Sequence, residues 1–151
     1  KITIAAYYPT NYEVNILKFI EIASKKNFRI ALPVIKSSSD MCFKLWIFKE
    51  PLYMNNFGIL EPRNSKVEIV PDLILVPLVV FDRQLNRIGY GKGYYDKALE
   101  QLALASSRPI RTIGLAYSWQ EVPPLTPALH DVPLDQIWTE NEVITCQPKS
   151  R

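Results

Sequence analysis

Residue types that commonly build active sites are scarce in this chain of 151 residues. It contains two cysteines, Cys42 and Cys146, and one histidine, His130. The two cysteines give neither a metal-binding spacing nor a disulfide framework, so we expect reduced thiols. The sequence also lacks a convincing Ser-His-Asp or Cys-His combination for nucleophilic catalysis. A lone loop histidine is usually structural or solvated, which makes His130 a weak candidate.

Long apolar runs and an excess of one charge are also missing. No apolar segment is long enough to cross a membrane, and the sequence has no signal-peptide pattern. The net charge is only +3, and the basic residues are spread out, which argues against a nucleic-acid footprint. We therefore expect a cytoplasmic protein that binds neither nucleic acid nor membrane. The sequence does not give the oligomeric state, and we take a monomer as the default.

Glycine is rare and unevenly distributed, since three of the five glycines lie within Arg87–Asp96. This segment reads Arg-Ile-Gly-Tyr-Gly-Lys-Gly-Tyr-Tyr-Asp. Glycine accepts positive φ and lets a ligand approach the backbone, and the N-terminus of a following helix binds phosphate. The spacing is neither a Walker A sequence nor a dinucleotide fingerprint, so a simple strand-to-helix turn remains the alternative. Lys92 favours phosphate binding because its point charge suits a transferring phosphoryl group.

Short apolar runs alternate with helical patterns along the chain, which predicts an α/β protein with a mostly parallel central sheet. The expected strands are 2–8, 28–34, 73–77, 111–116 and 134–139. Thr10-Asn11-Tyr12-Glu13 fits a capping box that would start a helix. A second helical pattern begins at Gly93. We expect residues 1–151 to form a single domain, with 36–66 as a small excursion from the main sheet.

Carboxylates and aromatic residues complete the candidate site. Asp96 lies in the first turn after the glycine loop, where it either complements the helix dipole or holds Mg²⁺. Asp131 is the best second carboxylate. Glu13 follows the first strand, at the edge where ligands bind in open α/β sheets. Tyr90 and Tyr94 suit stacking on a flat heterocycle.

The segments Val70–Pro77, Phe81–Arg83 and Asn86–Asp96 closely resemble the signature of 5-formyltetrahydrofolate cyclo-ligases. Further similarities, which extend over almost the whole chain, are at Tyr8, Glu13, Glu61–Pro62, Gly114–Tyr117, Gln120, His130–Val132 and Leu134–Asp135. The resemblance implies the three-layer α/β sandwich shared with ribose-5-phosphate isomerases and CoA transferases. It also implies ATP- and Mg²⁺-dependent conversion of 5-formyltetrahydrofolate to 5,10-methenyltetrahydrofolate through phosphorylation of the formyl oxygen, with release of ADP and phosphate.

The same resemblance implies a role for individual residues. Lys92 would act at the transferring phosphoryl group as the catalytic residue, and Asp96 and Asp131 would hold Mg²⁺. The implied ATP-binding residues are Arg87, Ile88, Gly89, Tyr90, Gly91, Lys92, Gly93, Tyr94 and Tyr95. The implied folate-binding residues are Tyr8, Glu13, Tyr90, Gly91, Lys92, Gly93 and Tyr94.

Two features differ from the family pattern. Leu78 stands where members usually have glycine, a change that could alter the approach to the folate pocket. Members also begin with a helix whose Lys and Arg residues contact ATP and substrate. Nothing in this sequence matches that helix, and we expect it to belong to an upstream segment that is missing here. Three alternatives stay open: a non-catalytic folate- or nucleotide-binding relative, a sugar-phosphate isomerase of the same fold class, and a nucleic-acid-binding module.

Overall fold

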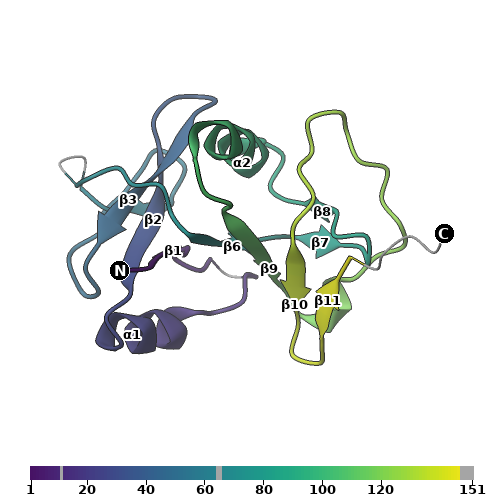
Figure 1. The fold of residues 1–151 in the computed structure, drawn as a ribbon, viewed down its shortest axis with the longest axis horizontal. Coiled ribbons are helices and arrows are strands. Elements are labelled where there is room, and N and C mark those ends of the chain that lie inside the picture. The colour runs from purple at the N-terminus through teal and green to yellow at the C-terminus, as the bar shows by residue number, and fades with distance from the viewer. Residues whose placement is uncertain (11, 64–65, 147–151) are drawn as a thin grey trace.

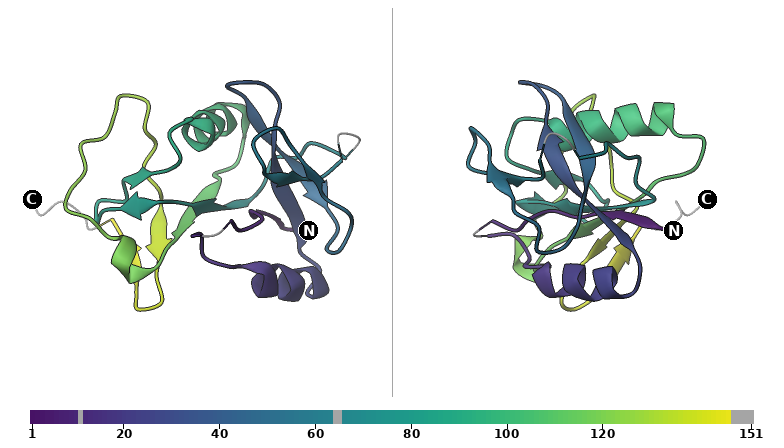
Figure 2. Two further views of the ribbon diagram at one scale, coloured as in Figure 1. Left: turned by 180° about the vertical axis from the view of Figure 1, so that it is seen from behind. Right: turned by 90° about the vertical axis from the view of Figure 1, so that its left-hand side faces the viewer.

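The computed structural model describes residues 1–10, 12–63 and 66–146, and across them it forms a seven-stranded sheet with a helix on each face (Figures 1 and 2). The strand order is β11-β10-β9-β6-β1-β2-β3. The strands are β1 (Thr3–Ala5), β2 (Arg29–Ile35), β3 (Met41–Trp46), β6 (Leu73–Pro77), β9 (Arg111–Leu115), β10 (Gln136–Trp138) and β11 (Val143–Thr145). The five inner strands are parallel to one another, and β3 and β11 pair antiparallel at the two edges. The expected α/β class with a mostly parallel sheet is confirmed.

Two helices connect parallel strands across the sheet. Helix α1 (Leu17–Lys25) joins β1 to β2, and α2 (Tyr94–Ala105) lies between β6 and β9. Parallel neighbours need such crossover connections, because a tight turn can join only antiparallel strands. No helix in the described ranges is long and apolar enough to cross a membrane.

Each face of the sheet has its own apolar core, because successive strand residues point to opposite faces. Ile74 and Val76 of β6 belong to the cluster that includes Leu99 of α2. Leu75 of the same strand belongs to the cluster that includes Ile20 of α1. Strand β6 is therefore buried from both sides, as the continuous apolar run 73–77 predicted.

The first helix begins later than the sequence predicts. Thr10 does donate its backbone N–H to Glu13 Oε1 at 2.8 Å, as in a capping box, but α1 starts only at Leu17. Between them the chain is held in a loop by the Tyr7 hydroxyl, which donates to the Val14 carbonyl at 2.8 Å. The predicted helix start was therefore wrong. Asn11, part of the predicted box, lies outside the described residues.

Segment 36–66 contributes to two sheets. Strand β3 belongs to the main sheet, whereas β4 (Tyr53–Met54) and β5 (Leu60–Glu61) form a separate antiparallel pair. Glu61 Oε2 accepts the backbone N–H of Ile35 at 2.7 Å, which ties this small pair to the end of β2.

A short hairpin leads into the glycine loop. It consists of β7 (Val80–Phe81) and β8 (Arg87–Ile88), which pair antiparallel. The buried Asp82 carboxylate holds its turn, accepting backbone N–H groups from Gln84 and Asn86 at 2.9 and 3.0 Å. It also accepts the Leu125 N–H at 2.9 Å, which connects the hairpin to the proline-rich loop.

Candidate active site

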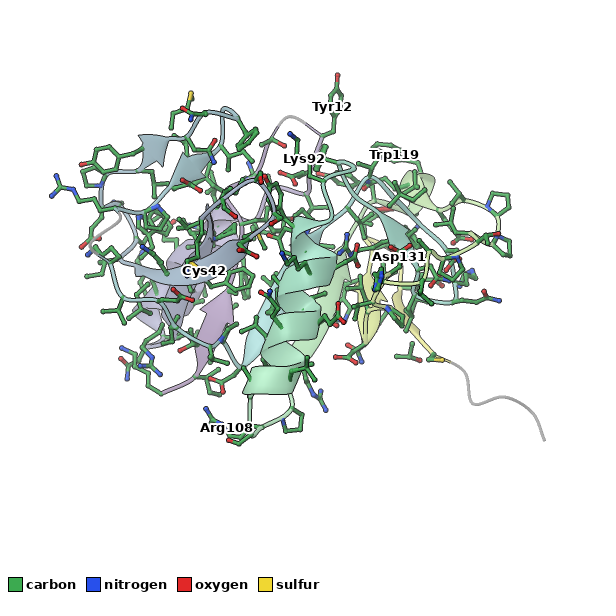
Figure 3. All side chains as sticks on the ribbon, turned by 90° about the horizontal axis from the view of Figure 1, so that it is seen from above. Tyr12, Cys42, Lys92, Arg108, Trp119 and Asp131 are labelled. Carbon is green, nitrogen blue, oxygen red and sulfur yellow. The ribbon has the colours of Figure 1, made fainter. Side chains whose placement is uncertain are left out.

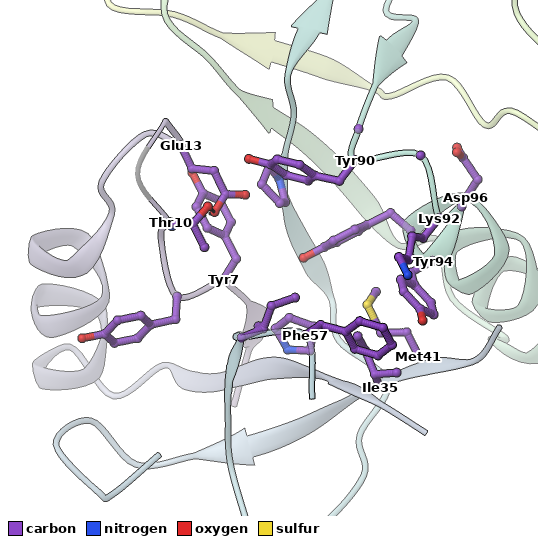
Figure 4. A pocket seen from close by; sticks show the side chains of 18 of the residues that line it. Tyr7, Thr10, Glu13, Ile35, Met41, Phe57, Tyr90, Lys92, Tyr94 and Asp96 are labelled. Carbon is purple, nitrogen blue, oxygen red and sulfur yellow. Dashed lines mark hydrogen bonds between the residues drawn. The ribbon is translucent and has the colours of Figure 1, made fainter. Parts of the chain in front are cut away.

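The carboxyl ends of β1, β2 and β6 open into a cavity of about 620 Å³ (Figure 4). This volume is typical of sites for small organic molecules, and the strand ends are where open α/β sheets bind ligands. The cavity is lined by all the residues predicted for the site, namely Tyr8, Glu13, Arg87, Ile88, Gly89, Tyr90, Gly91, Lys92, Gly93, Tyr94, Tyr95, Asp96 and Asp131. The fold thus brings together residues from three distant parts of the chain.

The glycine loop needs its glycines at two positions. Gly91 has φ of 87° and Gly93 has φ of 68°, in the left-handed region that other residues rarely adopt. Gly93 is the residue that precedes α2, and no side chain caps the N-terminus of this helix. The first backbone N–H groups of a helix have no partner within it. Since residues 93–96 line the cavity, this helix end is available to an anionic ligand.

Lys92 is the exposed cation of the loop. Its Nζ lies 4.5 Å from the centroid of the Phe57 ring, and no ion pair to it is found among the described residues. Phe57 also packs edge-on against Tyr94, with the ring centroids 6.4 Å apart. Figure 3 shows Lys92 near the N-terminal end of α2 and Asp131 on the side of the C-terminal strands. A weak cation–π contact leaves the ammonium group free to exchange Phe57 for a phosphate.

Arg87 is enclosed by its own loop. Its side chain is 5% exposed and donates from Nη2 to Asp96 Oδ1 at 3.2 Å. The guanidinium carbon lies 5.8 Å from the centroid of the Tyr95 ring. A Cβ on Gly89 would lie only 3.2 Å from Arg87 Nη1, so glycine allows the backbone to pass close to the guanidinium group. The Arg87 guanidinium group is therefore held by an ion pair with Asp96 and a cation–π contact with Tyr95.

The two carboxylates predicted to bind metal lie around the same end of the cavity. Asp96 Oδ1 also accepts the backbone N–H of Val132 at 3.1 Å, and Asp131 Oδ2 accepts that of Ala128 at 2.8 Å. No hydrogen bond from the described residues reaches the other oxygen of either carboxylate. This pair suits Mg²⁺, which takes one or two carboxylates and completes its shell with phosphates and water. Among the described residues, no group of three or more His, Cys, Asp or Glu side chains is placed to hold a metal ion.

Hydroxyl groups and one carboxylate gather at the opposite end (Figure 4). Glu13 Oε1 accepts both the backbone N–H and the hydroxyl of Thr10 at 2.8 Å. Burial raises the pKa values of Tyr7 and Tyr95, and the nearby Glu13 carboxylate adds to both shifts. Burial likewise raises the pKa of Tyr90. These phenols therefore stay neutral at physiological pH and can donate hydrogen bonds.

Sequence reasoning missed much of the apolar lining. It chose Tyr8 but not Tyr7, because Tyr7 lies within the apolar run 2–8 that predicts a buried strand. It also gave no site role to the loop that brings Phe57 over the glycine segment, where the turn-forming Gly58 and the family similarity at Glu61–Pro62 were the available signals. The unpredicted lining residues are Tyr7, Thr10, Pro33, Ile35, Met41, Phe57, Gly58, Ile59, Leu60, Glu61 and Pro77.

Three residues singled out from the sequence lie elsewhere. Leu78 is buried and does not line the cavity, so its effect on the approach to the folate pocket stays a prediction. It packs instead beside Gly114, where an added Cβ would lie 3.1 Å from Leu78 Cδ2. Gln120, at the end of η1 (Ser118–Gln120), donates from Nε2 to the carbonyls of Leu78 and Val79. His130 is exposed and does not line the cavity.

Comparison with known proteins gives a consistent result. The profile of the 5-formyltetrahydrofolate cyclo-ligase family matches residues 1–140. The 5-formyltetrahydrofolate cyclo-ligase of Haemophilus influenzae is 33% identical over 140 residues, covering 89% of this chain and 73% of the relative. The Escherichia coli protein of the same name is 29% identical over 147 residues, covering 93% and 79%.

Two solved structures extend the comparison to the fold. The 5,10-methenyltetrahydrofolate synthetase of Aquifex aeolicus superimposes with a TM-score of 0.78 at 27% identity, covering 99% of this chain and 74% of the other. The Mycoplasma pneumoniae synthetase gives a TM-score of 0.68 at 30% identity, covering 89% and 71%. The chain therefore belongs to the 5-formyltetrahydrofolate cyclo-ligase family, and it is an enzyme of the ligase class.

Proposed function

We propose that this chain catalyses the ATP- and Mg²⁺-dependent cyclisation of 5-formyltetrahydrofolate to 5,10-methenyltetrahydrofolate, with release of ADP and phosphate. The observation that carries the proposal is the assembly of residues 87–96 with Tyr8, Glu13 and Asp131 around one cavity at the carboxyl edge of the sheet, in a chain of this family. We assign the fold to the three-layer group of ribose-5-phosphate isomerases and CoA transferases, a choice supported by the helices on both faces. Monomeric state and cytoplasmic location remain predictions.

The proposed reaction needs activation of a poor electrophile. A formamide carbonyl resists attack, so its oxygen first takes the γ-phosphoryl group of ATP. N10 of the folate then attacks the activated carbon and loses its proton to solvent. The C–O bond of the phosphorylated formyl group breaks, and phosphate leaves with the former formyl oxygen. The enzyme supplies positioning and charge stabilisation rather than a nucleophile of its own. That division of labour fits a cavity whose reactive side chains are a lysine, carboxylates and phenols.

Lys92 is the residue we assign to the transferring phosphoryl group. It stands between two glycines with left-handed backbone, beside the open N-terminus of α2. A phosphoryl group in transit spreads negative charge over its oxygens, which an ammonium ion and helix N–H groups stabilise. The remaining residues of the segment 87–95 line the cavity along the nucleotide's proposed path.

Asp96 and Asp131 are the residues that would hold Mg²⁺. The ion would neutralise nucleotide phosphate charge, which is its usual contribution to phosphoryl transfer. Arg87 acts here through Asp96, because its guanidinium group fixes Oδ1 and leaves Oδ2 available.

The folate is assigned to the other end of the cavity, where Tyr8, Glu13 and Tyr90 lie. The second oxygen of Glu13 can accept N–H groups of a pteridine ring, and Tyr90 and Tyr94 offer aromatic surface for stacking.

A continuous absorbance assay tests the proposal. Full-length protein with 5-formyltetrahydrofolate, Mg²⁺ and ATP should accumulate methenyltetrahydrofolate, and omission of ATP should abolish the signal. Lys92→Ala should lower turnover by orders of magnitude while the protein stays folded. The matched control is Lys26→Ala, which removes an exposed lysine at the end of α1, outside the cavity. Absence of ATP-dependent product from the unmodified protein would contradict the proposed activity, and near-normal turnover by Lys92→Ala would contradict the role of Lys92.

A further inference from the structure

A second cavity, of about 410 Å³, adjoins the first one. Tyr8 and Leu60 line both cavities, so the two spaces meet at these side chains. The rest of its lining comes from α1 and from the segment at the end of β3, namely Leu17, Trp46, Phe48, Lys49, Glu50 and Leu52. The second cavity therefore extends the folate end of the proposed site along the face of the sheet that α1 covers.

The walls of the second cavity are mostly apolar and aromatic. Trp46 and Phe48 pack edge to face, with ring centroids 5.8 Å apart and an interplanar angle of 79°. The indole N–H of Trp46 donates to the Glu50 carbonyl at 3.2 Å, so this polar group is satisfied within the wall. Leu17, Phe48 and Leu52 are only partly buried against the core beneath α1, which leaves apolar surface for a ligand. Such walls suit a flat, uncharged ring.

Lys49 places one exposed positive charge in this lining. Its Nζ lies 6.0 Å from the centroid of the Phe48 ring, and no ion pair to it is found in the described part of the chain. The carboxylate of the adjacent Glu50 is already paired with Lys66 Nζ at 2.7 Å. The Lys49 ammonium group is therefore available to an anionic ligand.

The backbone at Lys49 gives no reason for a lysine there. The Glu50 N–H donates to the Ile47 carbonyl at 2.9 Å and closes a tight turn, in which Lys49 has φ of 76°. Glycine or asparagine usually takes such a position. Leu85 also has a positive φ, of 70°, but its side chain is buried in the core, which explains why it is not glycine. The side chain of Lys49 is exposed, so a role in binding is the explanation that its surroundings support.

We propose that the second cavity binds the p-aminobenzoylglutamate half of the folate substrate, with the Lys49 ammonium group pairing with a carboxylate of that half. This assignment rests on the proposed function, which leaves the first cavity to the nucleotide and the pteridine. In a folate, the pteridine is joined through N10 to a benzoyl ring that carries the glutamate. The ring matches the aromatic walls, and the glutamate carboxylates match the charge of Lys49. Tyr8, which lines both cavities, lies where the two halves would join.

The test is Lys49→Asn, which keeps a residue that accepts this turn and removes the charge, with Lys26→Asn as the matched control. Lys26 is exposed at the end of α1 and lines neither cavity. Titration calorimetry on the full-length protein measures the Kd of 5-formyltetrahydrofolate and that of 5-formyltetrahydropterin, which lacks the p-aminobenzoylglutamate half. Thermal unfolding reports the free protein.

Lys49→Asn should raise the Kd of 5-formyltetrahydrofolate about 2- to 5-fold, as expected for one exposed ion pair. Lys49→Glu replaces attraction by repulsion and should raise that Kd about 4- to 25-fold. Both variants should leave the Kd of 5-formyltetrahydropterin within about twofold of the unmodified protein's value, because the compound has no carboxylate for residue 49 to meet. The Tm of free Lys49→Asn should stay equal or rise, since asparagine tolerates the left-handed backbone.

Each possible outcome decides for or against the second cavity. An unchanged folate Kd in Lys49→Glu, or an equal loss for the compound without the tail, overturns the proposal. A lower Tm of Lys49→Asn with an unchanged folate Kd assigns Lys49 to a contact within the chain and overturns it as well. If the unmodified protein binds 5-formyltetrahydrofolate but forms no methenyltetrahydrofolate, the proposed function fails while the second cavity stands or falls by the variants' Kd values. If the unmodified protein does not bind folate, both fail.

Discussion

Replacing Arg87 with methionine should destabilise the protein mainly by leaving Asp96 without its partner. Removal of one member of a buried ion pair costs about 3–5 kcal/mol, because the remaining charge stays desolvated. Arg87 is 5% exposed but Asp96 is 22% exposed, so water recovers part of that penalty. We therefore expect a loss of about 2–3 kcal/mol. For a protein of this size, that loss lowers Tm by roughly 4–12 °C.

A double-mutant cycle measured by urea unfolding tests the pair itself. Arg87→Met, Asp96→Asn and the double variant should show a coupling of about 1–3 kcal/mol, since the second substitution removes a group already left unpaired. The matched control is Arg108→Met, whose side chain is 78% exposed and contacts Asp72 at 3.4 Å. Loss of that exposed pair should change the free energy of unfolding by less than about 1 kcal/mol. If the destabilising effects of the Arg87 and Asp96 substitutions simply add, the ion pair between these two residues does not contribute to stability.

Three further predictions concern the loop, the hairpin and the metal. Gly93→Ala should cost about 1–2 kcal/mol in urea unfolding, because Gly93 has φ of 68° and an added Cβ would meet no atom within 4 Å, leaving only backbone strain. Equal stability of the variant would refute that strain. Burial acts to raise the pKa of Asp82, but hydrogen bonds from Leu125, Asn86 and Gln84 outweigh it and hold the pKa below its ordinary value. The stabilisation by Asp82 should thus be present above about pH 4 and vanish as pH falls through its folded-state pKa, so that the stability gap to Asp82→Asn closes in acid; a gap independent of pH would argue against this. Asp96→Asn should raise the Mg²⁺ concentration for half-maximal turnover at least about tenfold, and an unchanged Mg²⁺ titration would count against Asp96 as a ligand.

The sequence predicted the central strands and the glycine loop because their signals are local. The apolar run 73–77 can be stable only where both faces are buried, and it forms the centre of the sheet. The three alternating glycines mark backbone conformations that other residues avoid. Family resemblance then gathered Glu13, Asp96 and Asp131 into one site, and the fold does bring them to one cavity.

Features that depend on distant contacts could not be predicted in this way. The capping-box pattern at Thr10 was correct as a hydrogen-bonded turn but wrong as a helix start, because the Tyr7 hydroxyl holds the Val14 carbonyl in a loop. Strand β11 is three residues long and is defined by its pairing with β10, so it carries little pattern of its own. The contact of Phe57 with Lys92 joins two loops and has no counterpart in local spacing.

The different surroundings of two neighbouring residues likewise became visible only in three dimensions. Tyr95 and Asp96 are adjacent in sequence, and the family resemblance gave them to the nucleotide and its metal. Their hydrogen-bond environments differ, since Asp96 accepts the backbone N–H of Val132 while the buried hydroxyl of Tyr95 has no hydrogen-bond partner among the described residues.

The central claim is that ATP phosphorylates the formyl oxygen, and isotope transfer tests it most directly. 5-Formyltetrahydrofolate labelled with ¹⁸O in the formyl group is turned over with unlabelled ATP, and the released phosphate is analysed by mass spectrometry. Phosphorylation of that oxygen predicts one ¹⁸O atom in each phosphate formed. Unlabelled phosphate, with the label released into water, would contradict the proposed mechanism.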